Sequence, residues 1–204
     1  MRLLPEHKCI FIHIPKTGGN SITKSLDGLS NCRALGRDAR PFLKHVKARD
    51  MKAGVDGEVW GSHFKFAVVR NPWDQMVSCY HWWLQKASRL ETHQESVAEI
   101  RAMDGFGGFM RSPYGGEMLN QCTGSSYDWV SDDAGGLLVD YVGRFETLNE
   151  SWGEICDRLG VERTELKHLN QTKRTHYRDY YTDETRDIVA RRFARLIEEF
   201  GYSF

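Results

Sequence analysis

The sequence predicts an α/β protein of three layers, in which a central parallel sheet is flanked by helices. Two observations indicate this fold. Short apolar, strand-like segments alternate with helical segments along the chain, and the first two strands end at turn-forming residues that lead directly into a helix. The chain has 204 residues, 40% of them hydrophobic, and shows no internal repeat or linker, so we expect one domain over residues 1–204.

The first strand is expected over residues 9–14, CIFIHI, which are almost continuously apolar and rich in β-branched side chains. Such a run is typical of a strand that is covered on both faces of a parallel sheet. It ends at Pro15, the turn formers KTGGNS follow, and residues 21–26 are expected to be helical.

The second strand is expected over residues 64–70, FKFAVVR. It stops at Asn71 and Pro72, where asparagine can cap a helix and proline fits its first turn. This helix is expected to run to about Lys86.

The rest of the chain continues the alternation. Glycine after an amphipathic segment marks a helix end, and a glycine-rich stretch favours a loop that could border a cleft. In order, we expect a helix over 95–103, a loop over 104–116, a strand over 141–145, a helix over 148–159 closed by Gly160, and a helix over 183–200 closed by Gly201.

Charge and cysteine content exclude several classes of partner. Lysine plus arginine and aspartate plus glutamate both total 28, so no net field favours nucleic acid or a membrane surface. The five cysteines are scattered and form no C-x-x-C pair, so we expect reduced thiols and no metal. The N-terminal apolar run is too short to span a membrane and lacks a cleavage site, so a cytoplasmic protein is expected.

The first strand-to-helix junction has the composition of a phosphate-binding loop. Paired glycines let backbone N–H groups approach an anion, a helix N-terminus adds donors, and a lysine adds charge. It is not a Walker A motif, because the lysine precedes both glycines. The alternative is that PKTGGNS is only a tight turn. The residues concerned are Lys16, Thr17, Gly18, Gly19, Asn20 and Ser21.

The second junction, VVRNPWDQMVSCY, places Arg70 at the carboxyl end of a strand and Ser78 two turns into the next helix. Ligands of open parallel sheets bind at the carboxyl ends of strands, where Lys16 is also expected. An arginine can contact a phosphate through two nitrogens, and a serine hydroxyl can add a further bond.

These two elements, HIPKTGGNSI and FKFAVVRNPWDQMVSCY, resemble the nucleotide-binding elements of the carbohydrate sulfotransferase family, and the likeness extends through most of the chain. The resemblance implies one sulfotransferase domain with a P-loop-like fold and the donor 3′-phosphoadenosine-5′-phosphosulfate, which leaves as 3′,5′-adenosine bisphosphate. It implies that Lys16 to Ser21 bind the 5′-phosphosulfate and that Arg70 and Ser78 bind the 3′-phosphate. A later basic segment, LKHLNQTKRTHYRDYYTDE, implies further ligands: Lys173, Arg174 and Tyr177. A solvated basic face is the alternative for Lys173 and Arg174.

Transfer to a hydroxyl group needs a base, and histidine has the best-matched pKa near neutral pH. Of eight histidines, His45 lies where glycan-modifying relatives carry a catalytic histidine, which makes it the first candidate. His63, directly before the second strand, is the second. Lys16 is the candidate for stabilising charge on the leaving group.

The expected activity is therefore sulfuryl transfer to a hydroxyl group of a glycan or another small polar molecule. One alternative is a nucleotide kinase or hydrolase with a variant phosphate loop, although no convincing magnesium carboxylate follows an apolar strand. The other is a domain that binds adenosine nucleotides as a sensor without turnover. Neither the acceptor nor the oligomeric state is indicated by the sequence.

Overall fold

The computed structural model describes residues 2–29, 45–116, 125–166 and 174–204. They fall into two compact units, each described here by itself. The first unit comprises Met1–Arg70 and Ser126–Asn170, and the second comprises Asn71–Ser125 and Gln171–Phe204. The expectation of one domain over 1–204 stays a prediction.

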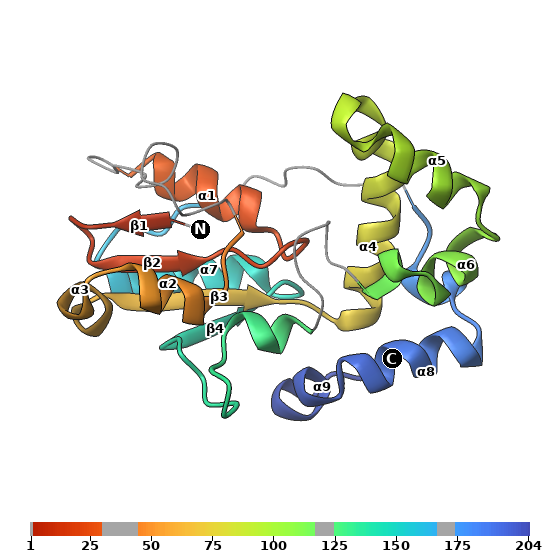
Figure 1. Ribbon diagram of the computed structural model, residues 1–204. Helices are drawn as coiled ribbons and strands as arrows, with labels where there is room; N and C mark the ends of the chain where they lie inside the picture. The colour runs from red at the N-terminus through yellow and green to blue at the C-terminus, as the bar shows by residue number, and fades with distance from the viewer. Residues whose placement is uncertain (1, 30–44, 117–124, 167–173) are drawn as a thin grey trace. The chain divides into compact units, whose positions relative to one another are not determined.

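The first unit contains a four-stranded sheet in the order β1, β2, β3, β4 (Figure 1). Its strands are β1 (Arg2–Leu4), β2 (Cys9–Ile12), β3 (Phe64–Val69) and β4 (Tyr141–Arg144). The parallel pairing of β2 with β3 and of β3 with β4 confirms the predicted central parallel sheet. The edge strand β1 was not predicted; it pairs antiparallel with β2 after a tight turn in which Lys8 N–H donates to the Pro5 carbonyl.

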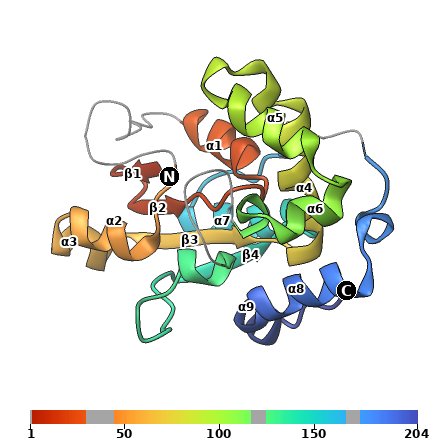
Figure 2. The same ribbon diagram turned by 45° about the vertical axis from the view of Figure 1, so that its right-hand side comes forward.

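Helices cover both faces of this sheet. Figure 1 shows α7 (Leu148–Leu159) behind the sheet and α2 (Ala48–Gly54) in front of it. The helix α1 (Gly19–Asp27) follows the loop after β2 in both views (Figures 1 and 2), and α3 (Gly57–Ser62) leads into β3. The three-layer arrangement was therefore predicted correctly, whereas α2 and α3 were missed.

One face of the sheet carries a hydrophobic cluster. Side chains of alternate strand residues point to this face and pack against one side of α1 and of α7. Phe66 stacks between Phe11 and Phe64, with ring centroids 5.1 and 5.6 Å away. The buried members are Leu4, Cys9, Phe11, Ile22, Leu26, Phe66, Val68, Trp152, Ile155, Cys156 and Leu166.

The second unit is helical in its described part. It comprises α4 (Pro72–Gln85), α5 (Gln94–Ala102), α6 (Gly105–Arg111), α8 (Asp183–Arg192), α9 (Ala194–Phe200) and four short 3₁₀ helices: Ala87–Arg89, Glu91–His93, Pro113–Gly116 and Tyr177–Tyr180. The predicted start of α4 is confirmed, since the Asn71 side chain accepts hydrogen bonds from the N–H groups of Trp73 and Asp74.

Two predictions in this unit were wrong. The glycine-rich stretch 104–116 is not a loop, because Phe106, Phe109 and Met110 give it a buried helical face as α6. The helix expected over 183–200 is two helices, which break at Phe193, a buried residue with a non-helical ψ of 19°. Its predicted end at Gly201 is confirmed by the left-handed φ of 61°.

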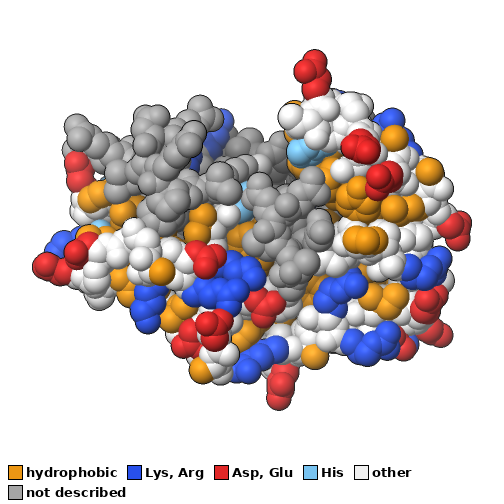
Figure 3. Space-filling model, in the orientation of Figure 1, with side chains coloured by type: hydrophobic (Ala, Val, Ile, Leu, Met, Phe, Trp, Pro, Cys, Tyr) orange, Lys and Arg blue, Asp and Glu red, His pale blue; other side chains and the backbone are white. Residues whose placement is uncertain are grey.

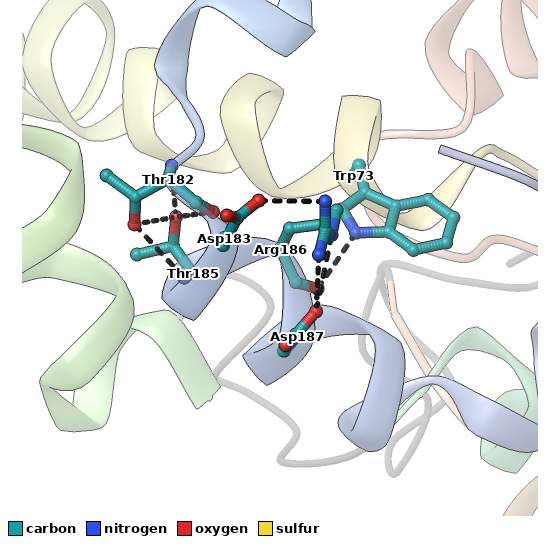
Figure 4. A network of polar contacts seen from close by, with 6 residues as sticks. All are labelled: Trp73, Thr182, Asp183, Thr185, Arg186 and Asp187. Carbon is teal, nitrogen blue, oxygen red and sulfur yellow. Dashed lines mark hydrogen bonds and ion pairs between the residues drawn. The ribbon is translucent and has the colours of Figure 1, made fainter.

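The start of α8 is tied to α4 by a polar network (Figure 4). Thr182 and Thr185 form a reciprocal capping box at the helix N-terminus. The indole N–H of Trp73, in α4, donates a hydrogen bond of 3.1 Å to the Arg186 carbonyl oxygen. This carbonyl belongs to the fourth residue of α8, so the tryptophan connects α4 to the first turn of α8.

On the face drawn in Figure 3, basic and acidic side chains are interspersed, in keeping with the formal net charge of zero. Among the described residues, no helix is both long enough and apolar enough to cross a membrane. Cys9, Cys79 and Cys156 are buried cysteines, and Cys32 and Cys122 lie outside the described residues.

We expect Phe66→Ala to lower the free energy of unfolding by about 3–5 kcal/mol, because it removes a fully buried ring and leaves a cavity. Phe64→Ala is the matched control: Phe64 is only partly buried at the end of the same stack, so its cost is smaller. Urea unfolding of the three proteins measures both values. An equal loss of unfolding free energy in Phe66→Ala and Phe64→Ala would contradict the placement of the core at Phe66.

Candidate functional site

Three parallel strands of the first unit end at one edge of the sheet. β2 is followed by the loop 13–18, β3 by Arg70 and β4 by Phe145. Because parallel strands present their carboxyl ends on the same side, the two predicted binding elements meet at this edge.

The loop between β2 and α1 curls tightly. Thr17 is fully buried, and its hydroxyl donates a hydrogen bond of 2.9 Å to the carbonyl oxygen of Ile14. Lys16 and Gly18 both have left-handed backbone, with φ of 67° and 81°. That conformation costs a non-glycine residue of order 1–3 kcal/mol, so the surrounding contacts hold Lys16 in place. A turn of this kind before a helix N-terminus is a typical anion-binding geometry.

Both loop glycines are required by close packing. A Cβ atom on Gly18 would lie 2.8 Å from Leu148 Cδ2 and 3.1 Å from Phe145 Cδ2. A Cβ atom on Gly19 would lie 2.1 Å from the ring of His13. The backbone therefore takes the space that side chains would fill, and a substitution at either glycine would displace these neighbours.

Arg70 joins the ends of all three strands. Its side chain is buried, its Nη1 donates a hydrogen bond of 2.8 Å to the Lys16 carbonyl oxygen, and its guanidinium carbon lies 3.9 Å from the centroid of the Phe145 ring. Phe145 N–H in turn donates to the Val69 carbonyl. Arg70 and the Lys16 loop therefore belong to one site.

His45 lies beside the same loop. Its Nδ1 is 2.9 Å from the His13 carbonyl oxygen, and a carbonyl can only accept, so Nδ1 carries the proton. In the neutral ring the lone pair is then on Nε2, which is the arrangement a general base needs. The structure thus brings together Lys16 and His45, two of the three predicted catalytic residues.

His63 is not brought to this site. It precedes β3, whereas Arg70 follows it, so the two lie at opposite ends of a strand of about 20 Å. There it borders a partly buried network in which the Lys65 ammonium donates to the carbonyls of Trp60 and His63 and pairs with Asp140 at 2.9 Å. This position supports the start of β3 and does not favour His63 as the base.

Of the remaining predicted ligands, Asn20 and Ser21 lie in the first turn of α1 in the first unit. Ser78, Arg174 and Tyr177 belong to the second unit. Ser78 is buried in α4, and Asp74 on the same helix forms an ion pair with Arg174. Tyr177 begins a 3₁₀ helix, with its ring centroid 5.7 Å from that of Phe204. Lys173 lies outside the described residues.

Sequence reasoning missed two residues that organise these side chains, Phe145 and Asp74. Phe145 is the last residue of the strand predicted over 141–145, as Arg70 is of the strand predicted over 64–70, and this shared position was the available signal. Asp74 gave no local signal, because its partner Arg174 is 100 residues away. No group of three or more His, Cys, Asp or Glu residues suited to holding a metal occurs in the described segments.

Comparison with known proteins identifies a family. The profile described as the sulfotransferase family matches residues 1–203. No curated protein and no solved structure matches the chain.

The stability of the first unit is expected to depend on the titration of His63. Burial lowers the pKa of its imidazole below the usual 6.5, and the charges of Lys8 and Lys65 act in the same direction. Below about pH 6.5 the unfolded chain then binds more protons than the folded chain, so stability falls as the pH decreases. We expect His63→Gln to reduce this loss, measured by urea unfolding between about pH 7.5 and 5. An unchanged pH slope in the variant would contradict the assignment.

Proposed function

The chain belongs to the sulfotransferase family, whose activity is sulfuryl transfer, and on that premise we propose that it transfers the group from 3′-phosphoadenosine-5′-phosphosulfate to a hydroxyl of a carbohydrate or another polar acceptor. The observation that carries this proposal is the hydrogen bond from Arg70 Nη1 to the Lys16 carbonyl oxygen, 2.8 Å long. It unites, within one unit, two cationic elements suited to the two anionic ends of one nucleotide.

The donor would be held mainly through its anionic groups. Lys16 and the backbone of the curled loop before α1 would bind the 5′-phosphosulfate, with Thr17, Gly18, Gly19, Asn20 and Ser21 completing the loop. Arg70 and Ser78 would bind the 3′-phosphate, and Lys173, Arg174 and Tyr177 would add contacts. When bound, this donor supplies the sulfuryl group and a good leaving group, 3′,5′-adenosine bisphosphate.

Two residues of the first unit have the properties that the chemistry requires. The Lys16 ammonium would stabilise the negative charge that develops on the leaving phosphate oxygen. His45 would accept the proton of the attacking hydroxyl at Nε2, while its Nδ1–H stays bonded to the His13 carbonyl. The hydroxyl oxygen forms the new bond to sulfur, and the bond from sulfur to the phosphate oxygen breaks.

The activity is tested by incubating the full chain with the phosphosulfate donor and a panel of glycans and small alcohols, with and without a chelator. We expect acceptor-dependent release of 3′,5′-adenosine bisphosphate and no effect of the chelator, because lysine and backbone donors stabilise the charge. Loss of activity with chelator would support a magnesium-dependent nucleotide enzyme. Tight nucleotide binding without turnover, and no effect of His45→Gln, would support a sensor.

We expect Arg70→Ala to weaken binding of 3′,5′-adenosine bisphosphate by about 1.5–3 kcal/mol, the scale of a hydrogen bond to a charged group. Calorimetric titration measures the affinity. Arg158→Ala is the matched control, because Arg158 also lies over an aromatic ring, that of Tyr141, but near the opposite edge of the sheet.

Adenosine 5′-phosphosulfate, which lacks the 3′-phosphate, separates direct contact from support of the loop. If Arg70 binds the 3′-phosphate, the loss in Arg70→Ala is much smaller for this nucleotide than for the bisphosphate. Equal losses would assign Arg70 to loop support alone. Unchanged bisphosphate affinity in a folded Arg70→Ala protein would contradict the 3′-phosphate role.

A further inference from the structure

His13 lies between the two parts of the proposed reaction centre, although no step described so far uses its side chain. The residue directly follows β2, is only 3% exposed, and stacks on Phe11 with ring centroids 5.4 Å apart and an interplanar angle of 23°. A ring fixed in this way by a core side chain has little freedom to rotate.

One side of the His13 ring contacts the phosphate loop. An ideal Cβ on Gly19 would lie 2.1 Å from both Cδ2 and Nε2 of His13 and 2.9 Å from its Cε1. The first residue of α1 therefore packs its backbone directly against the imidazole. Any shift of the loop toward the ring must displace the ring, because the interior is close-packed.

His13 also contacts His45. The two ring centroids are 4.6 Å apart with an interplanar angle of 61°, and the His13 carbonyl accepts the bond from His45 Nδ1. On another side, Trp129, which is fully buried, meets His45 edge-on with centroids 6.3 Å apart. His45 is thus oriented by His13 and by a fixed aromatic ring.

We propose that His13 is a positioning residue that couples the phosphate loop to His45, so that the position of the loop sets the orientation of the base. This inference rests on the proposed function, in which the loop holds the donor and His45 accepts the proton. The His13 side chain transmits position by contact and takes no part in the bonds that form or break. Through this contact, the geometry of the loop and the acceptance of the proton by His45 depend on each other. A misplacement of a reacting group by about 1 Å can lower the rate of the reaction 100-fold.

The coupling predicts a specific pattern in a double-mutant cycle with His13→Ala and His45→Gln, assayed on the full chain. We expect His13→Ala to lower kcat about 10- to 100-fold with little change in the donor KM. In the His45→Gln protein, we expect the same substitution to change kcat by less than about twofold, because the group it positions is gone. Ile10→Ala, which opens a cavity on the other face of β2, is the control that should leave kcat unchanged.

The outcomes separate the coupling from the proposed function. One outcome is that His45→Gln lowers kcat but His13→Ala lowers kcat by the same factor in the native chain and in the His45→Gln chain. This outcome would overturn the coupling and leave the proposed function intact. A full kcat in His45→Gln would overturn the assignment of the base, and with it the coupling. A fall of kcat in Ile10→Ala equal to that in His13→Ala would reduce His13 to a packing residue and overturn the coupling.

A second measurement tests the contact without relying on activity. Gly19→Ala places a methyl group against the His13 ring, so it should lower the urea midpoint of the otherwise native chain. In His13→Ala the ring is absent, and the same substitution should leave the midpoint unchanged. An equal shift in both backgrounds would show that the loop does not press on His13 and would overturn the proposal.

Discussion

The contacts of the Arg70 guanidinium hold the site of the first unit together. Its donation to the Lys16 carbonyl and its position over the Phe145 ring connect the residues that follow β2, β3 and β4. A buried guanidinium needs such partners, because an unpaired buried charge is costly. The same contacts fix the left-handed Lys16, whose conformation would otherwise be unfavourable.

The second constraint is the absence of side-chain volume at the start of α1. Gly18 allows Leu148 and Phe145 to approach the loop, and Gly19 allows His13 to do so. The backbone of the loop therefore packs directly against the residues that follow β2 and β4 and against α7. In this arrangement the two glycines serve packing, so a side chain at either position would displace these neighbours.

Local patterns predicted the strands β2, β3 and β4, the helices α1, α4, α5 and α7, and the helix ends at Gly160 and Gly201. These patterns failed where the burial of particular side chains, and not the composition of the segment, decided the local structure. The glycine-rich residues Gly105–Arg111 form α6, because Phe106 and Phe109 are buried on one face of this helix. The amphipathic stretch 183–200 forms two helices, α8 and α9, which are separated at the buried Phe193. The hydrophobic periodicity of the stretch does not show this break.

The amino-acid sequence by itself determined the alternation of strands and helices. It also determined that a lysine and paired glycines follow one strand and that an arginine follows another. Tertiary structure decided that Arg70 reaches the loop from 54 residues away, that His45 reaches His13 from 32 residues away, and that His63 lies at the opposite edge. Such contacts depend on strand order and register. Those are set by the packing of whole layers, which no local run of residues encodes.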